Sequence, residues 1–336
     1  MTDSQLIEQA RAGNEGAFAE LLAPHRRLLH AHCYRMLGSL QDAEDATQET
    51  LLRAWRNLPA FQGRSSLRTW LYTIATNVCL RAIERRPQRV LPIDYGPAAD
   101  PHEPIREPLL ESVWIEPYPD EPLGVDDGLA GPEARYEQRE SIELAFTAAL
   151  QLLPARQRAV LILRDVLGFS GAEVADALNT TPASVYSALQ RAHATIQERR
   201  PDRTQQATLH ALGDENLRAI VTRYVDAWAN SDVDALVGML TDTATLAMPP
   251  IPSWYRGREA IGSIFRSAVF NDARSWRMVP TTANGQLAVG AYELDSSGGY
   301  APHGVTVLTL RDALIDEISH FRTPAMIERF GLPLRA

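Results

Sequence analysis

Several side chains in the last third of the chain are of types that transfer protons. Asp316 and His320 lie four residues apart in an alternating stretch, so a strand would place both on one face. A carboxylate beside an imidazole can serve as a general acid and base. His303, Arg258 and Tyr255 are further candidates in this region. Because surface and core histidines are more common than catalytic ones, we expect no catalytic residue and keep catalysis as the alternative.

The same region contains aromatic side chains that suit a small-molecule pocket. Ligand pockets are lined mainly by apolar and aromatic groups with a few polar ones. These residues would equally suit a plain core or a face on which another part of the chain docks. The candidates for the pocket are Trp228, Trp254, Tyr255, Trp276 and His320.

Residues 153–196 carry the pattern of two short helices joined by a tight turn. Ser170 and Glu173 have the spacing of a capping box, and Thr181 is a good N-cap before Pro182. An apolar stripe then packs the second helix: Val185, Leu189, Ala192 and Ile196. This is the pattern of a helix-turn-helix, which docks in the major groove of DNA. Helical hairpins of other function share the spacing.

The remaining elements follow from hydrophobic periodicity. Residues 1–86 have apolar residues at helical spacing and predict an all-helical region. Residues 214–330 predict two helices followed by alternating runs separated by glycine, which indicates an α+β domain with a strongly curved antiparallel sheet. The length of 336 residues fits two or three domains.

The acidity of the chain is concentrated in one segment. The formal net charge is −9, yet residues 90–133 alone hold 11 acidic residues, one arginine and nine prolines. Such a segment predicts an extended linker. It also contains Trp114, Ile115 and Tyr118, which are unusual in a spacer, so we expect it to dock on something.

Other patterns exclude some classes of protein. Cys33 and Cys79 lack the spacing of a metal site or a disulfide framework. No apolar run is long enough for a membrane helix, and no secretory signal is readable. These observations predict a cytoplasmic protein with no metal, no cofactor and no membrane partner.

Two motifs carry a resemblance to a known family. DAEDATQETLLRAWR and SSLRTWLYTIATN resemble domain 2 of group 4 (extracytoplasmic-function) sigma factors, and the helix-turn-helix resembles sigma domain 4. PPIPSWYRGREAI resembles the SnoaL-like polyketide-cyclase family, and the linker motif WIEPYPD is similar to that of sigma factors with such an appended domain. The implied domains are residues 1–89, the linker 90–133, residues 134–200 and residues 206–332. The resemblance implies two all-α domains and a cone-shaped α+β domain.

The resemblance also implies functional residues in sigma domain 2. Its acidic helix would bind core RNA polymerase through Asp42, Glu44, Asp45, Gln48, Glu49 and Trp55, with Leu51 and Leu52 packing beneath. Its next loop and helix would capture the unstacked −10 strand, since aromatic faces and amide groups can hold flipped bases. The −10 candidates are Gln62, Arg64, Ser65, Ser66, Trp70, Asn77 and Arg81.

Sigma domain 4 would read the −35 element. Thr181, Ala183, Ser184, Ser187 and Arg191 would face the major groove, and Arg156, Arg158 and Arg191 would contact phosphates. Tyr186 and Ala188 stand where many family members carry a Lys or Arg, so the −35 sequence is not readable.

The resemblance thus implies a transcription initiation factor whose partners are core RNA polymerase and promoter DNA. We expect the C-terminal domain to regulate this activity in cis, by docking on domain 2 or the linker or by sensing a small ligand. An anti-sigma factor is a further possible partner. Two alternatives stay open: a cyclase-like or isomerase-like enzyme fused to a DNA-binding region, and an ordinary repressor or activator.

Overall fold

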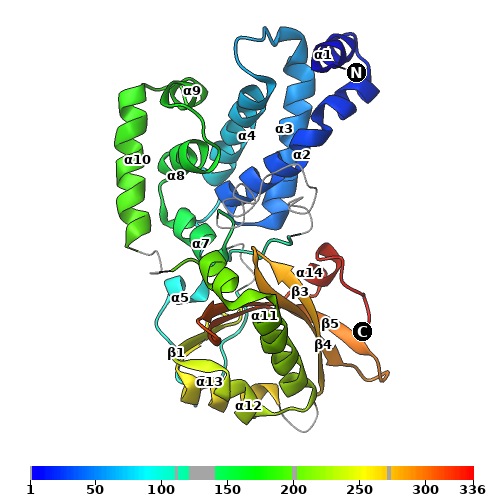
Figure 1. Ribbon diagram of the computed structural model, residues 1–336, viewed down its shortest axis with the longest axis vertical. Coiled ribbons are helices and arrows are strands. Elements are labelled where there is room, and N and C mark those ends of the chain that lie inside the picture. The colour runs from blue at the N-terminus through cyan, green and yellow to red at the C-terminus, as the bar shows by residue number, and fades with distance from the viewer. Residues whose placement is uncertain (1, 110–112, 121–140, 199–202, 271–273) are drawn as a thin grey trace. The chain divides into compact units, whose positions relative to one another are not determined.

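The computed structural model describes residues 2–109, 113–120, 141–198, 203–270 and 274–336, and they fall into two compact units (Figure 1). The helical unit consists of residues 2–89 and 145–198. The C-terminal unit consists of residues 90–109, 113–120, 141–144, 203–270 and 274–336.

Local capping explains where the first helices begin. They are α1 (Asp3–Arg11), α2 (Glu15–Leu37), α3 (Leu40–Asn57) and α4 (Leu67–Ile83), with a 3-10 turn at Leu58–Ala60. The side chains of Thr2, Asn14, Ser39 and Ser66 each accept a backbone N–H of the following helix. Gly38 ends α2 in the left-handed region, at φ 68°, where glycine carries no steric penalty.

The second part of the helical unit has the expected helix-turn-helix. Its elements are α7 (Leu144–Leu152), α8 (Ala155–Leu161), a π-helical turn (Ile162–Val166), α9 (Gly171–Ala177) and α10 (Pro182–Gln197). The Ser170–Glu173 capping box and the Thr181 N-cap are both present. Asn179 occupies the turn in the left-handed region, at φ 49°.

The C-terminal unit packs helices against a six-stranded sheet. The helices are α5 (Pro92–Tyr95), α11 (Gln205–Ala229), α12 (Val233–Gly238), α13 (Arg258–Ile264), a π-helical turn (Phe265–Val269) and α14 (Ala325–Arg329). The strands are β1 (Leu240–Ala247), β2 (Trp254–Arg256), β3 (Trp276–Ala283), β4 (Gln286–Leu294), β5 (Tyr300–Arg311) and β6 (Leu314–Phe321). Figure 1 shows α11 lying along the sheet, and the core is built from its apolar face and the strands.

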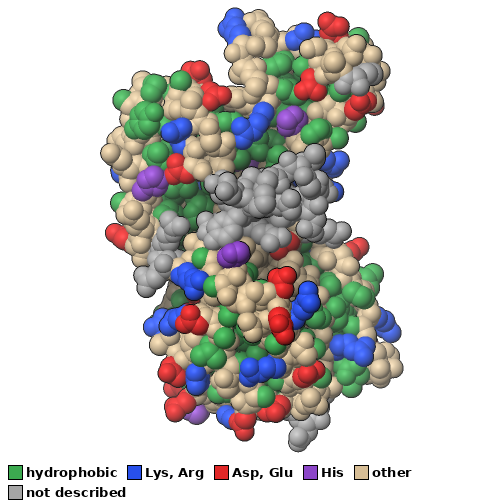
Figure 2. Space-filling view, in the orientation of Figure 1, with side chains coloured by type: hydrophobic (Ala, Val, Ile, Leu, Met, Phe, Trp, Pro, Cys, Tyr) green, Lys and Arg blue, Asp and Glu red, His purple; other side chains and the backbone are tan. Residues whose placement is uncertain are grey.

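The sheet differs from the expectation in one respect. Its order is β2-β1-β6-β5-β4-β3, and β1 pairs with β6 in parallel, so the sheet is mixed rather than purely antiparallel. The five longer strands were expected from their alternation, whereas β2 is too short to show a pattern. Acidic and basic side chains lie side by side on the visible face of this unit (Figure 2).

Gly304 permits a close approach between β5 and the end of β6. A Cβ at this position would lie 2.1 Å from the carbonyl oxygen of Phe321, which belongs to the backbone and cannot turn aside. The glycine therefore fixes how closely His303, its neighbour in β5, approaches β6.

We predict that Gly304→Ala lowers the free energy of unfolding of the C-terminal unit by about 1–3 kcal/mol, because the added methyl group forces the strands apart. Urea denaturation followed by tryptophan fluorescence measures the change. Gly238→Ala is the matched control, since nothing lies within 4 Å of a Cβ at the end of α12. Equal stability of the two variants would contradict this account of the strand contact.

Candidate functional site

Helix α3 presents a mixed acidic and apolar stripe to solvent. Asp45 and Gln48 are exposed, and Glu44 and Glu49 are half-buried. Leu52 was expected to pack in the core but is 51% exposed, since it follows Asp45 and Gln48 at helical spacing on the outer face. Trp55 is half-buried, and its ring packs edge-on against Phe18 with centroids 4.9 Å apart. We use the name α3 stripe for Asp45, Gln48 and Leu52.

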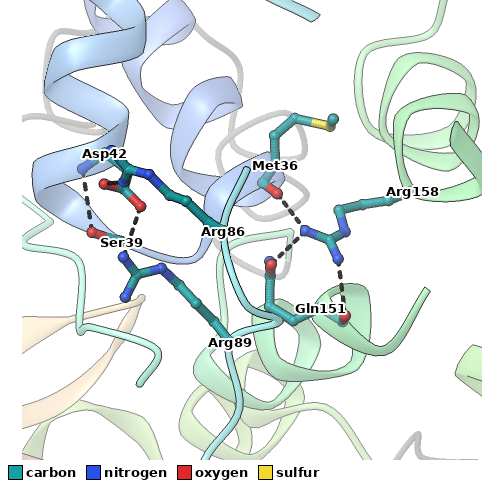
Figure 3. Close-up of polar contacts among 7 residues, drawn as sticks. All are labelled: Met36, Ser39, Asp42, Arg86, Arg89, Gln151 and Arg158. Atoms are coloured by element: carbon teal, nitrogen blue, oxygen red, sulfur yellow. Dashed lines mark hydrogen bonds and ion pairs between the residues drawn. The ribbon is translucent and has the colours of Figure 1, made fainter. Parts of the chain in front are cut away.

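Asp42 does not share the exposure of the α3 stripe. Its side chain is buried between two arginines: it forms an ion pair with Arg86, and Arg89 Nη2 lies 2.7 Å from its Oδ2 (Figure 3). Its backbone N–H donates to the Ser39 cap. In this arrangement Asp42 holds the end of α4 and residue 89 against α3 and is not available to a partner.

Most of the residues expected to bind the −10 strand lie in an exposed loop. Gln62, Arg64 and Ser65 are exposed, whereas the Ser66 hydroxyl caps α4 by accepting the Thr69 N–H at 3.0 Å. Trp70 is half-buried, and its ring lies 4.9 Å from that of Phe61. Arg81 is exposed near the end of α4.

The face of α4 that carries Asn77 lies against the helix-turn-helix. The Asn77 amide donates to the carbonyl of Thr73 at 2.8 Å and to that of Ala177 at 3.4 Å. Arg68 donates to the Leu167 carbonyl at 2.7 Å. We call this set of contacts between α4 and residues 167–177 the α4 seam. The Asn77 amide, which was expected to read a base, is therefore hydrogen-bonded within the α4 seam.

The exposed end of α10 matches the expectation for a DNA-reading helix. Thr181, Ala183, Ser184, Ser187 and Arg191 are all exposed. Arg191 donates to the Ser187 hydroxyl at 2.9 Å, and Arg156 is exposed with a long hydrogen bond, 3.4 Å, to the Leu178 carbonyl.

Arg158 is not placed as a phosphate contact. It is 4% exposed, and its terminal nitrogens donate to Met36 O at 2.5 Å and to Gln151 O at 2.9 Å (Figure 3). A further bond reaches Leu153 O at 3.2 Å. Burial lowers the pKa of the guanidinium to about 10. The expectation of an exposed arginine is wrong for this arrangement, because Arg158 caps the carboxyl end of α2, where a cation is favoured.

The described ends of the acidic linker are built into the C-terminal unit. Trp114, Ile115 and Tyr118 are buried, at 6%, 0% and 0% exposure. The Trp254 indole donates to Gly96 O at 2.7 Å. The expectation that this segment docks is therefore met within the C-terminal unit. Residues 110–112 and 121–133 of the linker lie outside the described residues, as do residues 134–140 that follow it.

One hairpin turn holds the two described stretches that precede and follow residues 121–140. Asn284, fully buried at φ 56° between β3 and β4, accepts the Tyr118 N–H at 2.8 Å and donates to Ile142 O at 2.8 Å. Gln286 accepts the Leu144 N–H at 2.9 Å, and the Glu143 carboxylate accepts the N–H groups of residues 205 and 206. We call the Asn284 contacts the turn clamp. No sequence signal beyond the dipeptide Asn-Gly pointed to it.

A cavity of about 60 Å³ opens into the core of the C-terminal unit. Of the expected pocket residues, Trp228, Trp276 and His320 line it. Trp254 and Tyr255 do not: Trp254 contacts the linker, and Tyr255 is buried in β2, paired with β1. His303, a candidate for proton transfer, and Met248 also line it, whereas sequence reasoning missed Tyr224, Met278 and Thr306.

The two histidines of the cavity pair with each other. His303 Nδ1 lies 2.9 Å from His320 Nε2, and His320 Nδ1 lies 2.8 Å from the Thr306 hydroxyl. Burial lowers the pKa of His303 to about 4, and burial together with His303 lowers that of His320 well below its usual value. Both imidazoles are therefore neutral at pH 7.

Asp316 does not join His320, contrary to the sequence expectation. It accepts hydrogen bonds from Thr241 and Arg311, each at 2.6 Å. The pairing of β5 with β6 shifts register between Thr309 and Leu310, which places one extra residue at Asp316. A bulge of this kind breaks the period of two on which the expectation relied.

Among the residues that the structure describes, no group of His, Cys, Asp and Glu side chains could hold a metal ion. Within the same ranges, no helix has both the length and the apolar character needed to span a membrane.

Three family models and several known proteins match this chain. Residues 21–88 match the sigma-70 region 2 family, residues 143–196 the sigma-70 region 4 family and residues 221–318 the SnoaL-like domain family. The chain is 44% identical over 323 residues to the ECF RNA polymerase sigma factor SigG of Mycobacterium tuberculosis, which covers 95% of this chain and 84% of that protein. It is 28% identical over 198 residues to the ECF sigma factor SigW of Bacillus subtilis, covering 58% of this chain and 95% of SigW.

A solved structure shows the same fold. The crystal structure of the extracytoplasmic function sigma factor SigJ of Mycobacterium tuberculosis aligns with a TM-score of 0.54 and 22% identity, over 92% of this chain and 97% of that one. The sigma regions, the SnoaL-like region and the 44% identity to SigG together confirm the resemblance found in the sequence. The chain belongs to the ECF RNA polymerase sigma factors, and its sigma regions are followed by a SnoaL-like domain.

Proposed function

We propose that this sigma factor binds core RNA polymerase and promoter DNA through separate surfaces of its helical unit, and that its SnoaL-like domain regulates it in cis. The turn clamp is the observation that carries the regulatory part. A passive tether would leave large apolar groups in solvent, whereas here Ile115 and Tyr118 are fully buried in the C-terminal unit.

The α3 stripe supports the assignment of the polymerase-binding surface. An exposed leucine beside an acid and an amide has the composition of an interface that pairs apolar contact with electrostatic attraction. Asp42 has a different role in this account. It is neutralised by Arg86 and Arg89 and holds the end of α4 in place.

The DNA-binding surfaces are the loop before α4 and the start of α10. Gln62, Arg64 and Ser65 are free to meet an unstacked strand, and Ser184 and Ser187 project from α10. The α4 seam engages Asn77, so capture of a flipped base by this amide requires the seam to open. Core binding would supply the free energy for opening only if polymerase binds the open form more tightly.

The linker supports regulation by the C-terminal domain. Segment 90–133 carries eleven acids and one arginine, which suits a basic channel by mimicking a polyanion. The turn clamp holds residues 118 and 142 of the C-terminal unit. Releasing the clamp would therefore change how the linker engages polymerase.

The enzyme alternative is not favoured. The proteins to which this chain is similar in sequence are sigma factors, which are not enzymes. Asp316, the expected carboxylate partner of His320, is bonded elsewhere.

We predict that Asp45→Arg weakens binding to core RNA polymerase about tenfold, which corresponds to about 1.4 kcal/mol, because it places a positive charge in the α3 stripe. Fluorescence anisotropy of labelled protein titrated with core measures the affinity. Glu20→Arg makes the same charge change at an exposed position of α2 and should bind as the parent does. If both variants bind alike, the α3 stripe is not the binding surface.

We predict that Asn284→Gly speeds amide hydrogen exchange at residues 115–118 about tenfold or more and changes the yield of run-off transcription with core polymerase. Glycine keeps the positive φ of the turn and removes two side-chain hydrogen bonds, one to Tyr118 of the linker and one to Ile142. The backbone N–H of residue 284 can still donate to the Tyr118 carbonyl, which it does at 2.8 Å in the parent. Asp312→Gly is the matched control, because Asp312 also has a positive φ, 55°, in the β5–β6 turn. Faster exchange with unchanged transcription would reduce the linker to a tether.

A further inference from the structure

We propose that the helical unit binds a small phosphate compound in a cavity between the segment that follows α4 and the start of α8. The regulatory consequence of this site rests on the proposed function, because a ligand there favours the closed arrangement of the helical unit. Three features of the cavity support the site: the charge of its described lining, a buried arginine nitrogen without a partner, and its volume.

The described lining of the cavity carries an excess of positive charge. Arg86 and Arg89 belong to the segment that follows α4, and Arg158 belongs to α8 (Figure 3). Asp42 is the one carboxylate among the described lining residues, and it is paired with Arg86 and Arg89. Three guanidinium groups thus share one carboxylate, which favours an anion as the ligand.

Arg158 supplies the donor that indicates a missing ligand. Its side chain is 4% exposed, and its Nε has no hydrogen-bond partner among the described residues. Within the same ranges, its terminal nitrogens donate only to neutral oxygens, which are backbone carbonyls and the Gln151 amide. Burial lowers the pKa of this guanidinium to about 10, whereas an anion beside it would stabilise the charged form. Because buried polar groups are nearly always hydrogen-bonded, the Nε atom indicates an absent acceptor.

The size and position of the cavity favour a small ligand. Its volume is about 200 Å³, which at about 10–15 Å³ for each water-sized group is more than a bare phosphate ion occupies. The Arg86 side chain is 43% exposed, whereas Arg158 is buried, so the cavity reaches from solvent to an interior donor. The backbone of a DNA duplex is too bulky to bring a phosphate to Arg158.

The donors identify phosphate as the anion. A guanidinium group presents its N–H groups as a planar fork that matches the spacing of phosphate oxygens, and the resulting charge-assisted hydrogen bonds are strong. A phosphate group has enough acceptor oxygens to bind Arg158 and Arg86 together. If Arg86 turned to the ligand, Asp42 would keep its ion pair with Arg89, whose Nη2 lies 2.7 Å from Oδ2.

The position of the site couples the ligand to the arrangement of the helical unit. Arg86 lies in the stretch that matches sigma-70 region 2, and Arg158 lies in the stretch that matches region 4. A ligand that contacts both arginines binds more tightly when the two regions lie together, so it shifts the equilibrium toward the closed form. Because core polymerase opens the unit in the proposed function, the phosphate compound acts as an inhibitor.

Isothermal titration calorimetry of the full-length protein with inorganic phosphate tests the site, with the ionic strength held constant by chloride. We expect saturable binding. Arg86→Gln should weaken it about tenfold, which corresponds to loss of one charge-assisted hydrogen bond. Arg86→Lys keeps the charge and should weaken it less. Arg85→Gln is the matched control, because it makes the same charge change at an exposed residue outside the lining.

Glycerol 3-phosphate distinguishes two sources of the phosphate group. Tighter binding than that of inorganic phosphate identifies the ligand as a phosphate ester, and equal or weaker binding identifies it as free phosphate. The absence of saturable binding by both compounds would overturn the proposal. So would equal binding of phosphate by the Arg86→Gln and Arg85→Gln variants.

The affinity for core polymerase tests the regulatory consequence. Saturating phosphate should weaken core binding by the parent about tenfold. The same phosphate concentration should weaken core binding by the Arg86→Gln variant less. Unchanged core affinity of the parent at saturating phosphate would overturn the coupling to the closed form. Core binding through the α3 stripe is measured without phosphate, so failure of this site is distinguishable from failure of the proposed function.

Discussion

The arrangement of the helical unit depends on the buried guanidinium of Arg158. A buried charge is tolerated only when its donors are satisfied, and here the acceptors are carbonyl oxygens of residues 36, 151 and 153. The Met36 carbonyl lies at the end of α2, where the helix dipole favours a cation. Gly38 permits the approach, since a Cβ there would lie 3.0 Å from the Gln151 side chain. This geometrically demanding contact and the α4 seam attach the helix-turn-helix to the first helices.

In our proposal, the contacts within the helical unit and the turn clamp affect two different steps of transcription initiation. In the helical unit, the α4 seam engages Asn77, an amide expected to read a base. In the C-terminal unit, the turn clamp fixes residues 118 and 142, which flank the undescribed stretch from 121 to 140. We propose that regulation releases the α4 seam and the turn clamp, because Asn77 and the linker would each take part in transcription initiation.

The sequence predicted features that depend on local chemistry. The caps at Ser170 and Thr181 and the five longer strands follow from side chains a few residues apart. Features set by distant parts of the chain were not predictable. Arg158 looked like a surface arginine, and its burial depends on the end of α2. A one-residue bulge at Asp316 separated a pair that strand periodicity had joined.

We propose that the helical unit has a closed form, held by the α4 seam, that core polymerase opens. The most direct measurement is the distance between spin labels at Ser65→Cys, in the loop before α4, and Ala183→Cys, at the start of α10. Both positions are exposed, whereas the native Cys33 and Cys79 are buried. Our account predicts one distance population in the free protein and a longer one when core is added. An unchanged distance in a complex that still initiates transcription would contradict it.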